Sequence, residues 1–201
     1  MTYISLGSNC SVAYQLNKYG LRKTSYPFDW CCLNINQLIN VLENDFEDFE
    51  NFTINNQRLK LSEKHLYINN LDINNKPTYI ITNKYGVKMA HELCEGGDVD
   101  EMKEKIKRRI IRMNNNQRLD ITNIIFIRIE LNNLTQKNFE EKYTKLIKIL
   151  DKKYPNFKLI IISKNNRFII NDNIYFYQLD KFSDDWKMDD LDWFNMLSLT
   201  D

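Results

Sequence analysis

Residues 123–129 (Asn-Ile-Ile-Phe-Ile-Arg-Ile) decide the fold class, because an almost continuous apolar run is typical of a strand buried on both faces. Residues 158–163 (Lys-Leu-Ile-Ile-Ile-Ser) share the pattern, and residues 174–178 form a third strand candidate. Thr135 is placed to cap a helix between the first two strands. The apolar side chains of that helix recur at helical spacing: Phe139, Tyr143, Leu146, Ile147 and Leu150. Such a unit suits a right-handed parallel crossover, so we predict an α/β fold, a three-layer sandwich with a mainly parallel central sheet and flanking helices.

Shorter elements precede this unit. They are a strand over residues 3–6, helices over 11–19 and 35–43, a strand over 78–82, and a helix from a capping box at Asp98 to about Met113. Residues 44–76 mix aromatic, Asn and charged side chains, and we expect short helical turns and loops there. No repeat or linker divides the chain, so we expect a single α/β domain over residues 1–201, with a less regular insertion around 44–98.

Composition limits the classes of function. The 201 residues carry a formal net charge of +1, which argues against a general polyanion binder, and there is no strong nucleic-acid signal. The N-terminus lacks a secretory pattern, and no apolar run approaches the roughly 20 residues of a membrane helix. We therefore expect an intracellular, cytoplasmic protein with four reduced cysteines. The cysteine spacing and the presence of only two histidines argue against structural zinc, and we expect no metal or cofactor.

Cys10 is the first candidate for chemistry. The segment around it, residues 5–10 (Ser-Leu-Gly-Ser-Asn-Cys), follows a strand candidate and precedes a helix candidate. This order places the thiol at a helix N-terminus, where unpaired N–H groups and the helix dipole favour a thiolate. Gly7 permits an unusual φ or a close backbone approach, and Ser8 and Asn9 are candidate donors to a developing oxyanion. The alternative is a small buried cysteine beneath a helix.

A cysteine nucleophile requires a general base, and the chain offers His65 and His91. His91 is favoured, because it follows a predicted strand and turn, whereas His65 lies in a charged stretch without a clear pattern. Without Cys10, a structural or surface role for His91 would be the simpler interpretation.

Charged groups in apolar settings complete the candidate site. Asp29, flanked by Phe28 and Trp30, is a candidate for the group that orients the histidine, and its alternative role is a cap or turn carboxylate. Glu92 and Glu130 are weaker candidates. Arg128 interrupts an apolar strand, so it either binds an anionic group at the strand end or pairs with Glu130 or Asp29.

Two further segments have plain structural interpretations. The basic run 103–112 is predicted to be a solvated helix face, with nucleic-acid contact as the alternative. The tail 184–193 alternates acids with tryptophans, and either packs those tryptophans onto the core or forms a binding surface.

Several motifs together resemble a known family. They are residues 5–10, 25–30 (Ser-Tyr-Pro-Phe-Asp-Trp), 85–86 (Tyr-Gly), 90–92 (Ala-His-Glu), 107–109 (Lys-Arg-Arg) and 126–128 (Phe-Ile-Arg). They resemble the signature of papain-like cysteine peptidases found in bacteria and large DNA viruses. The resemblance implies a thiol peptidase with Cys10 as nucleophile and His91 as base, acting on a peptide or protein, in the host cell cytoplasm if the chain is viral.

Three hypotheses about function follow. The first is a cysteine hydrolase or acyl transferase that uses Cys10 and His91. The second is an α/β transferase or ligand-binding domain that holds a phosphate or sugar nucleotide at the Gly7–Cys10 turn, with Arg128 and Arg22 assisting. The third is a non-catalytic interaction protein that binds through residues 27–30 and the tail.

Overall fold

The computed structural model describes residues 1–55, 78–94, 96–118, 123–165, 172–182, 185–189 and 191–198. The elements in these ranges are β1 (Thr2–Ser5), α1 (Ser11–Lys18), β2 (Cys31–Cys32), α2 (Ile35–Glu43), β3 (Phe52–Asn55), β4 (Ile80–Asn83), β5 (Lys88–Met89), α3 (Val99–Arg118), β6 (Ile124–Glu130), α4 (Gln136–Lys153), β7 (Lys158–Ser163), β8 (Ile174–Gln178) and α5 (Trp193–Ser198). No helix in the described ranges combines the length and the apolar character needed to cross a bilayer.

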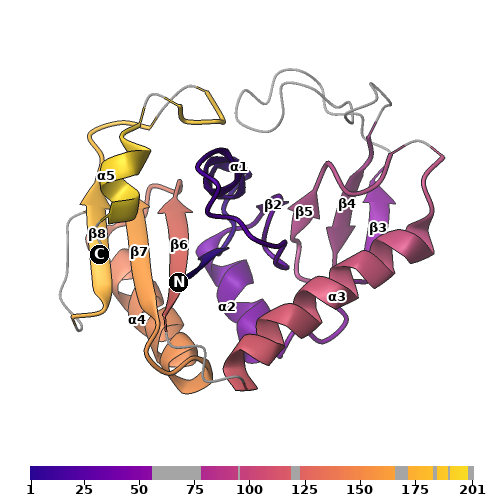
Figure 1. Ribbon diagram of the computed structural model, residues 1–201, viewed down its shortest axis with the longest axis horizontal. Coiled ribbons are helices and arrows are strands. Elements are labelled where there is room, and N and C mark those ends of the chain that lie inside the picture. Colours follow the sequence, from indigo (N-terminus) through magenta and orange to yellow (C-terminus); the bar gives the residue numbers. More distant parts are fainter. Residues whose placement is uncertain are drawn as a thin grey trace.

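Four strands form a parallel sheet in the order β1-β6-β7-β8 (Figure 1). The register aligns Ile4 with Phe126 across β1 and β6, and Arg128 with Ile161 across β6 and β7. The predicted parallel crossover is confirmed, since α4 connects β6 to its parallel neighbour β7. The Thr135 hydroxyl accepts a hydrogen bond from the Asn138 amide at 3.3 Å, so the predicted cap of α4 is present as well.

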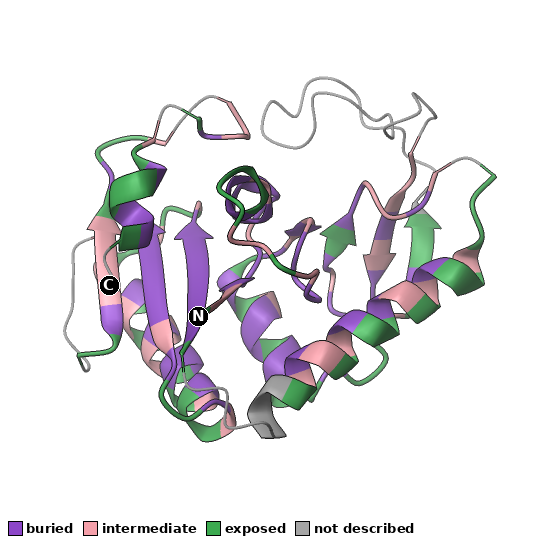
Figure 2. Cartoon of the chain, in the orientation of Figure 1, coloured by how far each residue is buried: buried purple, intermediate pink, exposed green. Residues whose placement is uncertain are grey.

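Helices cover both faces of this sheet, which confirms the three-layer α/β architecture. Successive side chains of a strand point to opposite faces. Phe126 therefore packs in the core cluster that contains the apolar faces of α2 and α4. Its neighbours Ile125 and Ile127 pack in a second cluster with Val12 of α1 and Trp193 of α5. Both faces of β6 are buried, as Figure 2 shows by its uniform colour.

A second, antiparallel sheet has the strand order β2-β5-β4-β3. This sheet was not predicted as a unit, although the strand expected over residues 78–82 is present as β4. The expectation of turns and loops was wrong at residues 52–55, which form β3. Strands of two to four residues are too short to establish an alternating pattern. Ile81, Val87 and Met89 of this segment nevertheless share the cluster that holds Ile4 and Phe126. One apolar core therefore joins the two sheets.

The turn between β1 and α1 packs tightly against residues 28–33, which contain β2 of the second sheet. Gly7 adopts a φ of +74°, and a Cβ at this position would lie 2.1 Å from Leu33 Cδ2 and 3.5 Å from the Phe28 carbonyl oxygen. Only glycine meets both requirements, the left-handed backbone and the missing side chain. Gly20 adopts a similar φ of +69°, but nothing lies within 4 Å of the corresponding Cβ position.

These two glycines provide a matched test of the packing at the turn. We expect Gly20→Ala to cost about 1–2 kcal/mol of unfolding free energy from backbone strain alone. Gly7→Ala should cost a further 1–3 kcal/mol, roughly, because Leu33 must move. Urea denaturation of both variants measures the difference. Equal losses for the two substitutions would contradict the close contact between Gly7 and Leu33.

Candidate functional site

The turn before α1 presents Cys10 as the N-cap residue of that helix, as predicted. The Tyr14 amide donates to the Cys10 carbonyl at 2.9 Å, which starts the helical ladder. Asn9 fixes the entry to the helix, because its Oδ1 accepts a hydrogen bond from the Ser11 amide at 3.0 Å. Ser8 adds a φ of +93°, which is unusual for a residue other than glycine. The thiol lies at the positive end of α1, and Cys10 is 2% exposed.

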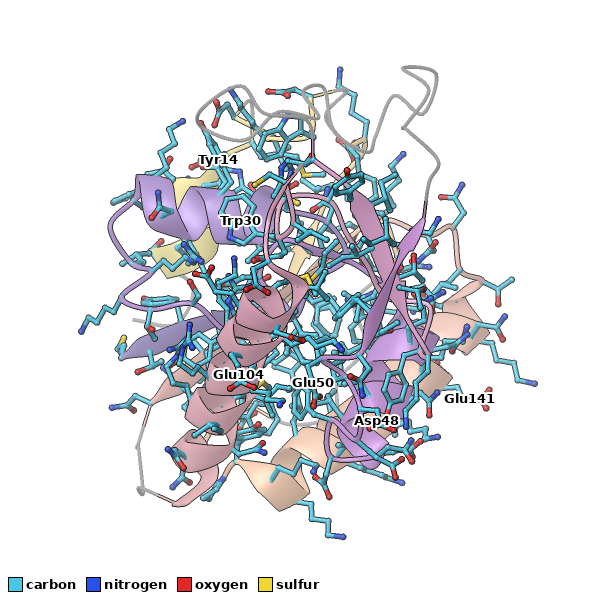
Figure 3. All side chains as sticks on the ribbon, turned by 90° about the vertical axis from the view of Figure 1, so that its right-hand side faces the viewer. Tyr14, Trp30, Asp48, Glu50, Glu104 and Glu141 are labelled. Carbon is cyan, nitrogen blue, oxygen red and sulfur yellow. The ribbon has the colours of Figure 1, made fainter. Side chains whose placement is uncertain are left out.

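Trp30 connects the aromatic motif to His91. Its ring meets the His91 ring edge-on with 6.3 Å between centroids, and the Arg22 guanidinium lies 5.5 Å from the centre of the Trp30 ring. The residue adopts a φ of +62°, a strained conformation for a bulky side chain. Figure 3 draws Trp30 between α1 and α3. The sequence predicted two roles for Trp30, as a flank of Asp29 and as part of the 27–30 binding surface, and neither indicated its contact with His91 or its strained backbone.

Asp29 is buried and tied to its own segment. Its Oδ2 accepts hydrogen bonds from Arg22 Nε at 2.8 Å and from the Tyr26 amide at 3.1 Å. Burial raises the pKa of this carboxyl, and the Arg22 charge opposes the rise. The carboxylate closes a turn, which was one of its two predicted roles, and it also fixes the guanidinium that covers Trp30. The stretch from Pro27 to Asp29 is buried, so it does not form the binding surface of the third hypothesis.

His91 lies two residues after the end of β5, and β5 pairs with β2 so that Met89 lies opposite Cys31. This pairing brings the His91 loop to the segment that contains Trp30. Burial lowers the pKa of His91 below its ordinary value of 6.5, and the Glu92 charge opposes that shift. The imidazole is therefore neutral at neutral pH, as a general base must be. The other candidate base, His65, lies outside the described residues.

Glu92 anchors the His91 loop to α3. Its carboxylate pairs with Arg109 Nη1 at 2.6 Å and with Lys105 Nζ at 2.6 Å, and its side chain is 3% exposed. Burial alone would raise the pKa of Glu92, but Arg109 and Lys105 outweigh it and hold the pKa below its ordinary value. The pair explains why the His-Glu and Lys-Arg-Arg motifs occur in one chain: the two segments meet in space.

Arg109 was missed as a buried residue, because the whole run 103–112 was predicted to be a solvated face. A signal was available, since Met102, Ile106 and Met113 share the helical spacing of Arg109 and form the buried face of α3. A cation on an apolar face requires a buried partner, which here is Glu92.

Cys31 lies between the Cys10 turn and the loop that carries His91 and Glu92. Burial raises the pKa of the Cys31 thiol well above its ordinary range; the Arg109 charge opposes the rise, while Glu92 and Cys10 add to it. Cys31 thus lies within electrostatic reach of both the Cys10 turn and the Glu92 loop. Its Sγ donates to the Pro27 carbonyl, and the residue is fully buried, so this thiol is neutral and protected.

Arg128 is fully buried and donates hydrogen bonds to the Leu6 carbonyl at 2.9 Å and to the Leu33 carbonyl at 3.2 Å. Its guanidinium also lies 3.7 Å from Glu130, so the predicted pairing with Glu130 is present. Glu130 in turn accepts hydrogen bonds from Asn132. The Arg128 side chain therefore supports the turn before Cys10 from inside the protein.

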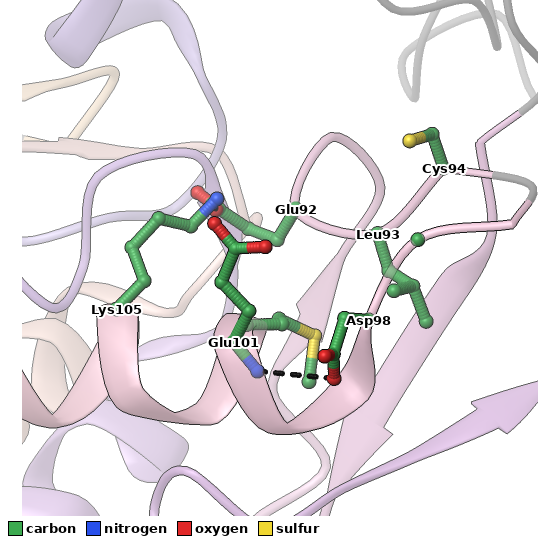
Figure 4. A pocket seen from close by; sticks show the side chains of 8 residues that line it. Glu92, Leu93, Cys94, Asp98, Glu101 and Lys105 are labelled. Atoms are coloured by element: carbon green, nitrogen blue, oxygen red, sulfur yellow. Dashed lines mark hydrogen bonds and ion pairs between the residues drawn. The ribbon is translucent and has the colours of Figure 1, made fainter.

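A pocket of about 150 Å³ lies beside the Glu92 loop, between that loop and the start of α3 (Figure 4). Its lining includes the carboxylates of Glu92, Asp98 and Glu101 and the ammonium of Lys105. Two of the acids serve the fold, since Glu92 binds Lys105 and Asp98 accepts hydrogen bonds from the first amides of α3. Within the described ranges, no group of three His, Cys, Asp or Glu side chains could hold a metal ion.

Comparison with known proteins gives a family match over most of the chain. The family model described as "Putative papain-like cysteine peptidase" matches residues 1–166. An uncharacterized protein of Acanthamoeba polyphaga mimivirus is 32% identical over 185 residues, covering 82% of this chain and 79% of the viral protein. No solved structure gives a significant match.

The buried ion pair predicts unequal effects for two neighbouring arginines. Arg109→Met should destabilise the protein by roughly 2–3 kcal/mol, because Glu92 loses its buried partner and keeps only the more exposed Lys105. Arg108→Met, at an exposed position on the same helix, should change the unfolding free energy by no more than about 0.5 kcal/mol. Urea denaturation compares the two. Similar small losses would mean that the Glu92 pair does not anchor the loop.

The lowered pKa of His91 predicts a pH dependence of stability. Below pH 6.5 the unfolded chain binds a proton at this position before the folded chain does, so folding loses stability as the pH falls. The slope is at most about 1.4 kcal/mol per pH unit. Denaturation of the wild type and His91→Gln at pH 7.5 and 5.5 isolates this contribution. The wild type should lose more stability than the variant on acidification, and equal losses would contradict the shift.

Proposed function

The chain belongs to the family described as "Putative papain-like cysteine peptidase", and we propose that it is a cysteine hydrolase with Cys10 as nucleophile and His91 as general base. Its substrate in this proposal is a peptide or protein. The cytoplasm suits the chemistry, because a reducing compartment keeps the nucleophilic thiol reduced.

One observation carries the proposal: the short segment of residues 30–33 contacts both the turn before Cys10 and His91. Gly7, three residues before Cys10, packs on Leu33. His91 packs on Trp30, near the other end of the same segment. Cys31, between these two contacts, is fully buried, and the charges of Arg109 and Glu92 influence the pKa of its thiol. A nucleophile and a base that rest on one rigid segment are held in a fixed relation, which nucleophilic catalysis requires.

The reaction follows from the roles of the two groups. His91 takes the proton of the Cys10 thiol, and the sulfur attacks the carbonyl carbon to give a tetrahedral intermediate. His91 then returns the proton to the leaving amine as the C–N bond breaks, which leaves a thioester on Cys10. Water, deprotonated by His91, attacks that thioester and releases the acid and the Cys10 thiol. Both substrate fragments are then free, and the enzyme is regenerated.

Donors for the oxyanion come from the turn itself. The backbone amide of Cys10 and the side chains of Ser8 and Asn9 are the candidates. Asn9 Oδ1 already accepts a hydrogen bond from the Ser11 amide, so the Nδ2 group of Asn9 is the candidate donor to the oxyanion. The Gly7–Ser8 backbone, with two consecutive positive φ values, shapes this turn.

Asp29 acts as a positioning residue in this scheme. It holds Arg22, which covers one side of Trp30, and the Trp30 ring in turn contacts His91. Loss of the carboxylate would leave Arg22 with Ser25 as its hydrogen-bond partner and would loosen the packing of Trp30 beside the base. Asp29 would therefore affect catalysis indirectly, through the packing of Arg22 and Trp30 beside His91.

The geometry favours a hydrolase over a phosphate or sugar-nucleotide site at the same turn. An anion cradle there would need nearby cations, and the two that the sequence offers are already engaged. Arg128 is fully buried against backbone carbonyls, and Arg22 is paired with Asp29. The helix N-terminus is left to stabilise a thiolate.

Substitution of the two reacting residues tests the proposal. Cys10→Ala should reduce hydrolysis of a dye-labelled, unfolded protein substrate by on the order of 10³-fold or more. His91→Ala should reduce it by about 10²- to 10⁴-fold, since proton transfer is lost. Cys94→Ala, at a partly exposed thiol outside the Cys10 turn, is the control and should retain full activity. Full activity of Cys10→Ala would exclude the proposed nucleophile. Stabilisation of that variant by a sugar nucleotide would support the anion site instead.

A further inference from the structure

A short segment near the C-terminus crosses α1 close to Cys10. We call residues Asp185–Asp189 the strap. The Ser11 hydroxyl donates to the Trp186 carbonyl. One turn further along α1, Gln15 Nε2 donates to the Lys187 carbonyl at 2.6 Å and to Asp189 Oδ1 at 2.7 Å. Figure 1 shows this part of the chain, in yellow, reaching from α5 toward α1.

The strap contacts the turn of α1 that carries the nucleophile. Ser11, the residue after Cys10, is fully buried under the Trp186 backbone, and Gln15 is fully buried as well. The Trp186 ring meets the Tyr14 ring edge-on at 5.3 Å, and Tyr14 lies one helical turn beyond Cys10. Lys187 lies over both rings. These contacts close the strap over the first turns of the helix.

The two ends of the strap are held differently. At one end, Met188 is buried in the apolar cluster of α1 and α5, and its carbonyl accepts a hydrogen bond from Trp193 Nε1 at 2.7 Å. The stretch from Asp185 to Lys187 is held on α1 by the two polar side chains of Ser11 and Gln15 and by the Tyr14 contact. The Met188 amide donates to the Asp185 carbonyl, so this stretch forms one turn. Release from α1 therefore moves a compact unit about a fixed anchor.

A closed strap conflicts with the reaction. The Cys10 sulfur must reach bonding distance of a substrate carbonyl, yet Cys10 is 2% exposed. Either the thiol stays inaccessible or a covering element moves away. The strap is attached to this part of α1 by a few polar contacts, at Ser11 beside Cys10 and at Gln15 one turn further on, so it is the candidate for the element that moves.

We propose that the strap is a lid that controls access to Cys10. This inference rests on the proposed function, because a lid matters only where the thiol reacts. The strap lies beyond residues 1–166, which the family model matches. In the closed state the lid shields the thiol, and in the open state Cys10 meets a polypeptide substrate.

Native-state alkylation tests the lid. The wild type and Gln15→Met are treated with iodoacetamide, and the rate at each cysteine is followed by peptide mass spectrometry. The substitution keeps the side-chain volume and removes both donors to the strap. The alkylation rate of Cys10 should rise roughly 5- to 30-fold, as expected for losing two hydrogen bonds that oppose a local opening. Ser11→Ala, which removes the bond to Trp186, is a second variant and should act in the same direction.

Two controls make the result specific. Lys18→Met removes an exposed ion pair with Asp189 and should change the Cys10 rate by less than about twofold. Cys31, fully buried and outside the strap, is the internal reference. A rise at Cys10 with a constant rate at Cys31 supports the lid. No rise at Cys10, or parallel rises at both thiols, overturns it, since the second outcome reports general loosening of the fold.

The test is independent of catalysis. Alkylation measures access to the Cys10 sulfur whether or not the enzyme hydrolyses a substrate. Unchanged hydrolysis by Cys10→Ala would refute the proposed function and leave the alkylation result intact. An unchanged alkylation rate in Gln15→Met would refute the lid and leave the roles of Cys10 and His91 untouched.

Discussion

The buried guanidinium of Arg128 is the interaction on which the arrangement of this protein depends. A fully buried cation must satisfy its donors within the protein, because no water replaces them. Arg128 meets most of this need: its two terminal nitrogens donate to the Leu6 and Leu33 carbonyls and its charge lies 3.7 Å from Glu130, whereas its Nε has no hydrogen-bond partner. Leu6 follows β1 and begins the turn that leads to Cys10, and Leu33 follows β2 of the antiparallel sheet. One side chain in the central strand thus fixes the chain segments that carry the site, and the high cost of an unpaired buried charge enforces their positions.

The same residue shows where prediction from sequence ends. A charge inside an apolar strand indicated that Arg128 needed a partner, and Glu130, two residues away, was one of the candidates. The Leu6 and Leu33 carbonyls lie 122 and 95 positions away in the chain, and no local pattern encodes such a contact. The parallel sheet was predictable because β6 and β7 are almost continuous apolar runs and α4 carries apolar residues at helical spacing. The antiparallel sheet was not, since its pairing depends on the core that it shares with β1 and β6.

The candidate site, too, could be predicted only in part. The position of Cys10 at a helix N-terminus could be predicted, because strand, turn and helix signals are consecutive in the sequence. The support of His91 could not, since it comes from Trp30 and from a buried ion pair between distant segments. That pair also has an electrostatic consequence. Burial lowers the pKa of His91, and the Glu92 charge opposes this. Because Arg109 and Lys105 offset the Glu92 charge, its pull on the imidazole is reduced, and the neutral base is favoured.

Two buried thiols in one site show why burial alone does not decide reactivity. Cys31 is enclosed by the core and donates to a carbonyl, and desolvation raises its pKa well above the ordinary range. Cys10 is nearly as buried, but it occupies the N-cap position of α1, where the helix dipole favours an anion, although its side chain makes no capping hydrogen bond. A helix terminus replaces part of the solvation that burial removes. In the proposed scheme, the strap would control access to the Cys10 sulfur while the helix end favours the thiolate, so access and activation would be set by separate parts of the structure.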